Sequence, residues 1–435
     1  MTNMKVLIIS AEVWQDKTNG GNILSNMFRN MHWEFAQIYC NPGMPENRIC
    51  KKYFQMTDSM VLRNFLSHKP IGKAFDFIYG EKENEISKNV IELPNQKFYK
   101  FFHNHRLGIF YSAKHFLWNI SNWKNENLKK FIDGFNPDII FAPCYGDQFM
   151  LRLTRFVGQY TGKKIISYIS DDHYTLKQFS LSPFFWIERF ILRKELRETF
   201  PYYSLVYTMT EAQKSQCEKD LHANMKILRK AASYKNFKKK ITVNAPIRII
   251  YAGGIYLNRW KTLKILVDVL KEINTNGVKA VLDIYTANEI TKKMNSALND
   301  GINSRIHFAV SQEKLKKIYQ NGDIALHVES FDIKNRLLVR MSFSTKIVDC
   351  LSSGCAVMAI CDQKQGGFEY LNSENAAFCV SNAAELKQIL QNILSNKNLV
   401  LEYANSAREC CIRNHNVGKI ENMIKCDFEK ILDNN

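Results

Sequence analysis

The sequence predicts an α/β protein built from two doubly wound domains, each with a parallel sheet between layers of helices. Three observations carry this prediction. A short apolar run at residues 5–10 suits a buried parallel strand, and a glycine-containing loop and a helical pattern at residues 22–31 follow it. The same order returns at residues 247–254 and 262–273, about half the chain later. A chain of 435 residues also exceeds one typical hydrophobic core.

The first half continues the alternation of strand and helix. Apolar runs at residues 137–144 and 163–170 are typical of buried strands, and residues 148–160 and 183–199 have helical spacing. Because a strand, a crossover helix and a second strand connect in the right-handed sense, these units predict a parallel sheet.

Four strand-like segments follow the second start, with helical segments between them. They are AVLDIYT (280–286), RIHFAV (305–310), DIALHVES (323–330) and CAVMAI (355–360). A basic, polar stretch that ends on a proline separates the two halves, and its composition suits an interdomain linker. We therefore expect a first domain at residues 1–235, a linker at 236–246 and a second domain at 247–408.

Charge and cysteine usage narrow the class of protein. The 60 Lys and Arg residues against 42 Asp and Glu give a formal charge of +18, which favours a phosphorylated substrate, a phospholipid surface or nucleic acid as partner. No zinc-finger, RRM or basic-tail pattern supports nucleic acid, so we expect none. The 11 cysteines form no CxxC pair, no signal-peptide pattern opens the sequence, and no apolar run approaches the roughly 20 residues that cross a bilayer. These features predict a cytoplasmic protein.

An aspartate inside an apolar helical run marks the first candidate site. In FSTKIVDCLSSGCAVMAI (343–360), Ser344 suits an N-cap and Gly354 suits the left-handed position that ends a helix. Asp349 would lie about 6–8 Å along the axis at roughly 1.5 Å per residue. At that distance a carboxylate can accept from the ribose of a nucleotide whose phosphate rests on the helix N-terminus. The alternative is a solvent-facing aspartate on a short helix.

This stretch, followed by QGGFEYL (365–371), resembles the donor-site segment of family 4 glycosyltransferases, which have the GT-B fold. The resemblance covers about 247–394 in the second domain and only the pattern and a few loops of the first. It implies two Rossmann-like domains that face each other across a cleft, with the amides of Ser344 and Thr345 on the donor diphosphate and Asp349 on the ribose. It also implies that the terminal helical segment, 409–435, packs back on the first domain.

Two glycine-containing loops extend the resemblance. YAGGIYLNRWKTL (251–263) is similar to the family's strand, glycine loop and basic segment, which implies that Gly254, Arg259 and Lys261 bind the donor diphosphate. The chemistry agrees, since a departing nucleoside diphosphate needs a positive clamp. The alternative for Arg259 is a surface side chain at a helix start. The Gly20-Gly21 loop resembles the family's N-terminal glycine loop over the cleft, although most such pairs are turns.

Polar residues after a strand of the first domain form a second candidate site. SYISDDHY (167–174) ends where doubly wound sheets bind ligands, and it resembles the position at which relatives carry a histidine beside the transferred sugar. The resemblance implies His173 in that role, with Asp171 and Asp172 contacting acceptor hydroxyls or transferring protons. A cap-and-turn role for the two aspartates is the alternative. Adjacent aspartates are not the Asp-x-Asp arrangement that binds a metal in other sugar transferases, so we expect neither a metal nor a cofactor.

One position departs from the family pattern. The family often has two glutamates eight residues apart, but the residue eight positions before Asp349 is Met341. Glu329, in HVESFD (327–332), is a loose candidate for the missing acid. The departure leaves the identity of the transferred sugar open.

The resemblance implies a glycosyltransferase that moves a sugar from a nucleotide donor to a hydroxyl of a glycan or lipid-linked acceptor, with retention, in bacterial surface polysaccharide or glycoconjugate synthesis. The alternatives are a nucleotide-sugar epimerase of the same architecture and a non-catalytic subunit that keeps the binding site. Basic and aromatic residues interleave at 97–130, and SPFFWIERFILRKEL (182–196) adds an apolar face flanked by charge. These two segments suit either a peripheral contact with an anionic membrane or core helices of the first domain.

Overall fold

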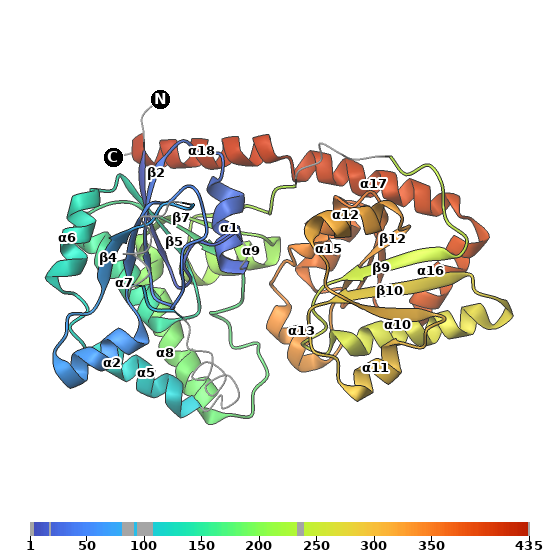
Figure 1. Cartoon of the computed structure of the whole chain (residues 1–435), viewed down its shortest axis with the longest axis horizontal. Coiled ribbons are helices and arrows are strands. Elements are labelled where there is room, and N and C mark those ends of the chain that lie inside the picture. Colours follow the sequence, from blue (N-terminus) through green and yellow to red (C-terminus); the bar gives the residue numbers. More distant parts are fainter. Residues whose placement is uncertain (1–3, 17–18, 81–90, 94–107, 233–238, 434–435) are drawn as a thin grey trace.

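The computed structural model describes residues 4–16, 19–80, 91–93, 108–232 and 239–433. They form two α/β domains that lie side by side, and the last two helices run along one side of both (Figure 1). The expectation of two doubly wound domains is confirmed. Part of the predicted linker, 236–238, and the first part of the basic and aromatic stretch at 97–130, residues 97–107, lie outside the described residues.

The first domain contains an eight-stranded sheet of order β4-β3-β2-β1-β5-β6-β7-β8. Its strands are β1 (Lys5–Ser10), β2 (Glu34–Tyr39), β3 (Lys52–Gln55), β4 (Lys73–Asp76), β5 (Ile139–Pro143), β6 (Ile165–Ile169), β7 (Tyr203–Thr208) and β8 (Met225–Ile227). Neighbours run parallel except β3 and β4, which are antiparallel. The expectation of a purely parallel sheet was wrong at this edge, because β4 is mostly exposed and lacks the cover on both faces that parallel strands need.

Helices cover both faces of the first sheet. They are α1 (Asn19–Phe28), α2 (Asp58–Ser67), α5 (Gly108–Ile120), α6 (Glu126–Phe135), α7 (Gln148–Thr161), α8 (Pro183–Thr199) and α9 (Glu211–Leu221). The central strands β5 and β6 are buried at every position, which explains their continuous apolar runs. The helices predicted at 148–160 and 183–199 correspond to α7 and α8.

The paired glycines near the N-terminus lie in a helix. Gly20 and Gly21 belong to the first turn of α1, so the expectation that they form a loop over the cleft was wrong in its local structure. The amides of a first helical turn have no carbonyl partner within the helix, and glycine is better tolerated there than in a helix interior.

The second domain contains a six-stranded parallel sheet of order β11-β10-β9-β12-β13-β14. Its strands are β9 (Ile247–Ala252), β10 (Ala280–Thr286), β11 (Ser304–Phe308), β12 (Ile324–Val328), β13 (Ala356–Ile360) and β14 (Phe378–Val380). Its helices are α10 (Arg259–Ile273), α11 (Lys292–Leu298), α12 (Gln312–Gln320), α13 (Ile333–Val339), α14 (Lys346–Leu351), α15 (Gly366–Ser373) and α16 (Ala383–Ser395). All four strands predicted after the second start are present.

Each sheet has a point at which the strand order reverses. It lies between β1 and β5 in the first domain and between β9 and β12 in the second. The connections on its two sides leave toward opposite faces of the sheet, so ligands bind at the carboxyl edge there. In the second domain the loops at this point carry Gly253, Gly254 and Glu329.

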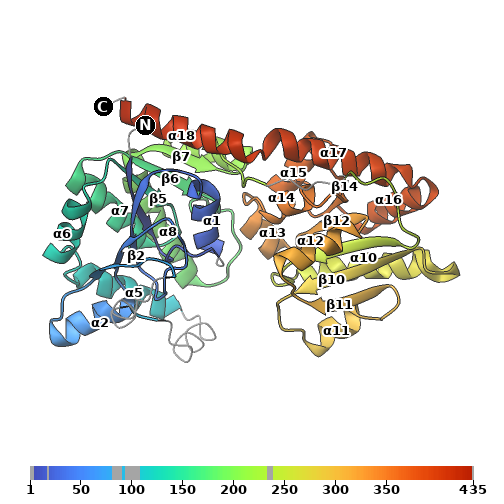
Figure 2. The same ribbon diagram turned by 45° about the horizontal axis from the view of Figure 1, so that its top comes forward.

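Two consecutive helices, α17 (Asn398–Asn414) and α18 (Val417–Asp433), end the chain and pass from one domain to the other (Figure 1, Figure 2). Helix α17 packs on β13, whereas α18 brings Phe428 against Phe28 and Trp33 of the first domain. The expected boundary at residue 408 therefore falls inside α17, and only α18 returns to the first domain. In the described part of the chain, no helix is long and apolar enough to span a bilayer.

The buried His415 lies between α17 and α18 and hydrogen-bonds to two other segments of the chain. His415 Nδ1 lies 2.8 Å from the Lys230 carbonyl oxygen, and its Nε2 lies 2.8 Å from the Tyr370 hydroxyl. Because a carbonyl only accepts, Nδ1 carries the proton and Nε2 accepts from Tyr370. Burial lowers the pKa of His415 to about 4, so the ring is neutral at neutral pH.

We expect the free energy of unfolding to fall as the pH is lowered from 6.5 to about 4, because the unfolded chain protonates His415 in this range and the folded chain does not. The loss attributable to this residue is at most about 3 kcal/mol. Urea unfolding of the wild type and His415→Gln at pH 7 and pH 4.5 measures it. The variant should be less stable at pH 7 but lose less on acidification, and equal losses in both proteins would contradict the assignment.

Candidate active site

The loops at the reversal point of the second sheet bring together an arginine and a glutamate. Arg259 Nε lies 2.8 Å from Glu329 Oε2, and Arg259 Nη2 lies 2.8 Å from Glu329 Oε1. Burial by itself lowers the pKa of Arg259, but the hydrogen bonds and charge of Glu329 outweigh it, and the pKa is raised. Arg259 Nη1 is buried without a hydrogen-bond partner among the described residues. The guanidinium therefore keeps donors for a ligand.

A second cation reaches the same point from α14. The Lys346 ammonium lies so close to Gly253 that a Cβ there would collide with Nζ and Cε, and it is 5.9 Å from the centre of the Tyr251 ring. Burial, followed by the charge of Arg259, lowers the pKa of Lys346. A side chain at position 253 would displace the end of Lys346 from this point.

Sequence reasoning missed Lys346, although the residue lies inside the stretch that marked the site. One feature of the sequence indicated that Lys346 is unusual, because a lysine in the first turn of a helix faces the positive end of the helix dipole and is unfavourable there. Its position close to Gly253 and Arg259 explains why a lysine stands there although the helix dipole disfavours it.

The electrostatic environment at this point is positive. His327 on β12 is buried, and its pKa is lowered to about 3, first by burial and then by the charges of Lys346 and Arg259. Glu329 balances one of the two cations. The arrangement suits a multiply charged anion such as a diphosphate.

The start of α14 differs from the expected capped helix. Thr345 occupies the N-cap position with helical backbone angles and no side-chain cap, so the assignment of Ser344 as N-cap was wrong. The amides of Ile347 and Val348 donate to the carbonyls of Ser344 and Thr345 three residues earlier, which tightens the chain into the helix without a cap. Gly354 has the expected left-handed φ of 84°.

Asp349 forms an ion pair with a lysine near the end of the first domain. Its Oδ1 lies 2.6 Å from Lys230 Nζ, and half of its side chain is exposed. Lys230 follows β8, so the pair connects the end of the first domain to α14 of the second. The ribose contact expected of Asp349 stays a prediction.

Asp172 is a buried connection between the two domains. Its Oδ1 lies 3.2 Å from Arg189, its Oδ2 lies 2.7 Å from Arg340 of the second domain, and Thr175 donates to both oxygens. Burial raises the pKa of Asp172, but the hydrogen bonds of Thr175 and the charge of Arg340 outweigh it, and the pKa is lowered. The catalytic role expected for Asp172 stays a prediction, and the geometry disfavours it, because a carboxylate with both oxygens occupied by cations is a poor base. The alternative turn-forming role is confirmed by the amides of Tyr174 and Thr175, which donate to Oδ1.

The neighbouring residues also meet the second domain. Asp171 Oδ1 accepts from the Ser342 hydroxyl at 2.6 Å. The ring of His173 packs against Gly146, where any Cβ would collide with it. Burial lowers the pKa of His173, partly opposed by the charge of Asp171. His173 thus lies in the loop after β6 at the carboxyl edge of the first sheet, as expected.

The structure shows the contacts of the two residues considered for the missing acid, Glu329 and Met341. Both oxygens of Glu329 accept from Arg259, which disfavours the expected acid or base role, and that role stays a prediction. Met341 is buried, and its carbonyl accepts from the Thr210 hydroxyl at 2.9 Å. This position therefore serves the contact between domains.

Lys261 is exposed and its Nζ lies 6.0 Å from the centre of the Trp260 ring. Two residues of helix turn a side chain by about 200°, so an inward Arg259 places Lys261 outward, and the structure does not bring Lys261 to the predicted site. Gly254 stays in the loop beside Arg259, and its carbonyl accepts from the Tyr251 hydroxyl at 2.6 Å.

Comparison with known proteins shows what this geometry resembles. Residues 264–422 match a family model described as glycosyl transferase-like. Sucrose-phosphate synthase from Thermosynechococcus elongatus has a TM-score of 0.63 at 13% identity, covering 99% of this chain and 100% of that one. The chain has the GT-B fold, and its second domain contains a glycosyltransferase-like segment.

Two other solved structures share the fold over almost the whole chain. Anabaena HepE, in complex with UDP and glucose, has a TM-score of 0.60 at 13% identity and covers 98% of this chain and 100% of its own. An E. coli trehalose-6-phosphate structure bound with UDP-2-fluoro glucose has a TM-score of 0.59 at 11% identity, with 98% and 99% covered. No curated protein sequence matches this chain.

A buried glutamine stands at the edge of the cationic site. Gln365 precedes α15, and neither its Oε1 nor its Nε2 has a hydrogen-bond partner in the described part of the chain. The next two residues fix its place: Gly366 packs against Thr210 of the first domain, and Gly367 packs against Ile347 of α14. The amide therefore lies between the domains, close to the start of α14.

We propose that the Gln365 amide recognises a substrate hydroxyl, and we therefore expect Gln365→Leu to lower kcat/KM for the donor by about 10- to 100-fold. The melting temperature should stay equal or rise, since the apolar replacement removes an unpartnered buried amide. Steady-state kinetics and a thermal melt measure both quantities. A loss of stability with unchanged kinetics would show that the amide is structural.

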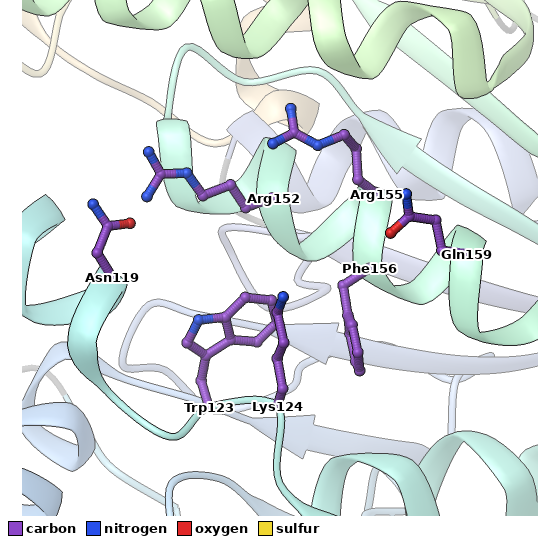
Figure 3. Close-up of a pocket in the computed structure, with 7 residues that line it drawn as sticks. All are labelled: Asn119, Trp123, Lys124, Arg152, Arg155, Phe156 and Gln159. Carbon is purple, nitrogen blue, oxygen red and sulfur yellow. The ribbon is translucent and has the colours of Figure 1, made fainter.

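The chain also has a pocket of about 400 Å³ in its first domain (Figure 3). It is lined by Asn119, Trp123, Lys124, Arg152, Arg155, Phe156 and Gln159. Arg152 and Arg155 both pair with the buried Glu195 of α8, which gives them a structural role. None of the predicted site residues lines this pocket.

Proposed function

We propose that this protein is a glycosyltransferase that transfers a sugar from a UDP-linked donor to a hydroxyl of a glycan or lipid-linked acceptor. The observation that carries the proposal is a pair of cations at the reversal point of the second sheet: Arg259, with its unpartnered Nη1, and Lys346, which lies against Gly253 and whose pKa the charge of Arg259 helps to lower. Bond cleavage at the anomeric carbon leaves negative charge on the diphosphate, and two fixed cations stabilise it. UDP is chosen because it is the nucleotide in the Anabaena complex and, as UDP-2-fluoro glucose, in the E. coli one.

The remaining site residues then have distinct tasks. Asp349, oriented by Lys230, accepts from the ribose hydroxyls, and Gln365 contacts the sugar. His173 approaches the sugar from the first domain. Arg259, whose charge Glu329 partly offsets, and Lys346 stabilise the diphosphate. The proposed reaction uses no metal, and the anomeric configuration is retained. We assign the enzyme to bacterial surface polysaccharide or glycoconjugate synthesis, in the cytoplasm at the inner face of the membrane.

The contacts of two carboxylates argue against the epimerase alternative. An epimerase needs acid and base groups around the sugar. Asp172 and Glu329 are each held by arginines, which disfavours proton transfer by either. The non-catalytic alternative has the buried Met341 in its favour, because this position supplies no acid.

A panel of UDP-, GDP- and ADP-sugars tests the proposal. Slow release of UDP from one UDP-sugar, together with a raised melting temperature in its presence, supports a UDP-sugar transferase. Binding without release in the presence of acceptor extracts would support the non-catalytic subunit. Interconversion of the sugar without release would support the epimerase.

A further inference from the structure

We propose that the surface formed by α2, α5 and α8 docks on an anionic phospholipid bilayer. The inference deepens the proposed function, because it assigns a surface to the membrane at which a lipid-linked acceptor would be met. Helix α5 contacts both α2 and α8, and Figure 1 shows α2 and α5 together at the bottom of the first domain with α8 beside them. We call this the three-helix surface.

Helix α8 exposes a continuous apolar stripe. Phe184, Ile187 and Phe190 recur at three-residue spacing, and Ile187 and Phe190 are 55% and 57% exposed. The opposite side of the helix buries Leu192 and Leu196. A helix that only filled the core would not expose these positions, so the core-helix interpretation fails for this face.

The neighbouring helices extend the apolar surface. On α2, Phe65 and Leu66 are 58% and 72% exposed, and on α5, Phe116 is 61% exposed with Ile120 one turn later. Leu181, just before α8, is 88% exposed. Large side chains gathered on three touching helices exceed the scattered exposure that is usual for a monomer surface.

Charge and position favour a bilayer as the occupant. Lys69 after α2, Lys177 before α8 and Lys194 on α8 are exposed beside the apolar side chains, in a chain of formal charge +18. Lysines around an apolar patch fit anionic headgroups above acyl chains. Helix α2 follows β3, and α8 follows β6 through the loop that carries His173, so both begin at the carboxyl edge of the first sheet. Docking here would bring the sugar site near an acceptor embedded in the membrane.

Vesicle flotation of the full chain tests the proposal, with phosphatidylcholine vesicles that contain or lack phosphatidylglycerol. The wild type should float with the anionic vesicles at low salt and less with the neutral ones. Ile187→Ser/Phe190→Ser and Phe65→Ser/Leu66→Ser should each lower the bound-to-free ratio by about tenfold. Phe308→Ser, at a position that is 92% exposed on the second domain, is the matched control and should bind as the wild type does.

Sedimentation and donor hydrolysis in solution separate the outcomes. All variants should keep the wild-type melting temperature and donor hydrolysis. The proposal is overturned if the wild type does not float, if the two double variants float as well as Phe308→Ser, or if they instead dissociate an oligomer, which would make the surface an interface between copies of the chain. Flotation without hydrolysis of any donor would refute the proposed function and leave the docking surface intact.

Discussion

Replacement of Arg259 by alanine is expected to lower kcat/KM for the nucleotide sugar by about 100- to 1,000-fold, because a fixed cation at the departing diphosphate is lost. The same change leaves Glu329 buried without its partner, which by itself destabilises the fold. The kinetic loss must therefore be separated from unfolding.

The double variant Arg259→Met/Glu329→Gln makes this separation. It removes both charges at once, so it should recover most of the melting temperature that Arg259→Ala loses while staying inactive. Lys264→Met on the same helix is the control, since Lys264 is exposed and pairs with Asp268. Recovery of activity in the double variant would mean that Arg259 acts only by balancing Glu329.

The second large effect concerns stability. Asp172→Ala should lower the free energy of unfolding by about 3–5 kcal/mol, because it leaves the buried Arg189 without its carboxylate. Guanidinium unfolding measures the loss. Arg340→Met keeps the ion pair between Asp172 and Arg189 and removes only the ion pair between Asp172 and Arg340. Its loss of unfolding free energy should therefore be smaller.

Kinetics of Asp172→Asn distinguish this bridging role from catalysis. The amide oxygen still accepts from the Thr175 backbone N–H, but the amide nitrogen cannot accept from the Thr175 hydroxyl and both ion pairs are weakened, so stability should fall and kcat should change by less than about tenfold. A fall in kcat of about 1,000-fold at unchanged stability would restore Asp172 as a catalytic base.

Local patterns allowed most of the fold to be predicted. The apolar strand at 280–286 and the helix at 183–199 have the predicted bounds, because burial and periodicity act within one segment. The edge strand β4 was not predicted, since KAFD is short and mostly exposed. Gly20 and Gly21 were placed in a loop because sequence alone does not separate a glycine in a turn from one in a first helical turn.

The site was predicted less completely because it depends on side-chain direction and on distant pairs. Arg259 was identified correctly from the sequence. The rotation of the helix turns Lys261 outward, so Lys346 and not Lys261 is the second cation at the site. The partners of Asp172 and Asp349, Arg340 and Lys230, lie 168 and 119 residues away, a distance over which no spacing rule operates.

The affinity of UDP for the wild type and Lys346→Met, measured by titration calorimetry, tests the cationic site most directly. We expect the wild type to bind UDP, Lys346→Met to bind it at least about tenfold more weakly, and the Lys264→Met control to match the wild type. UDP binding that is equal in all three proteins, or absent from the wild type, would contradict the assignment of the donor diphosphate to Arg259, Lys346 and Gly253.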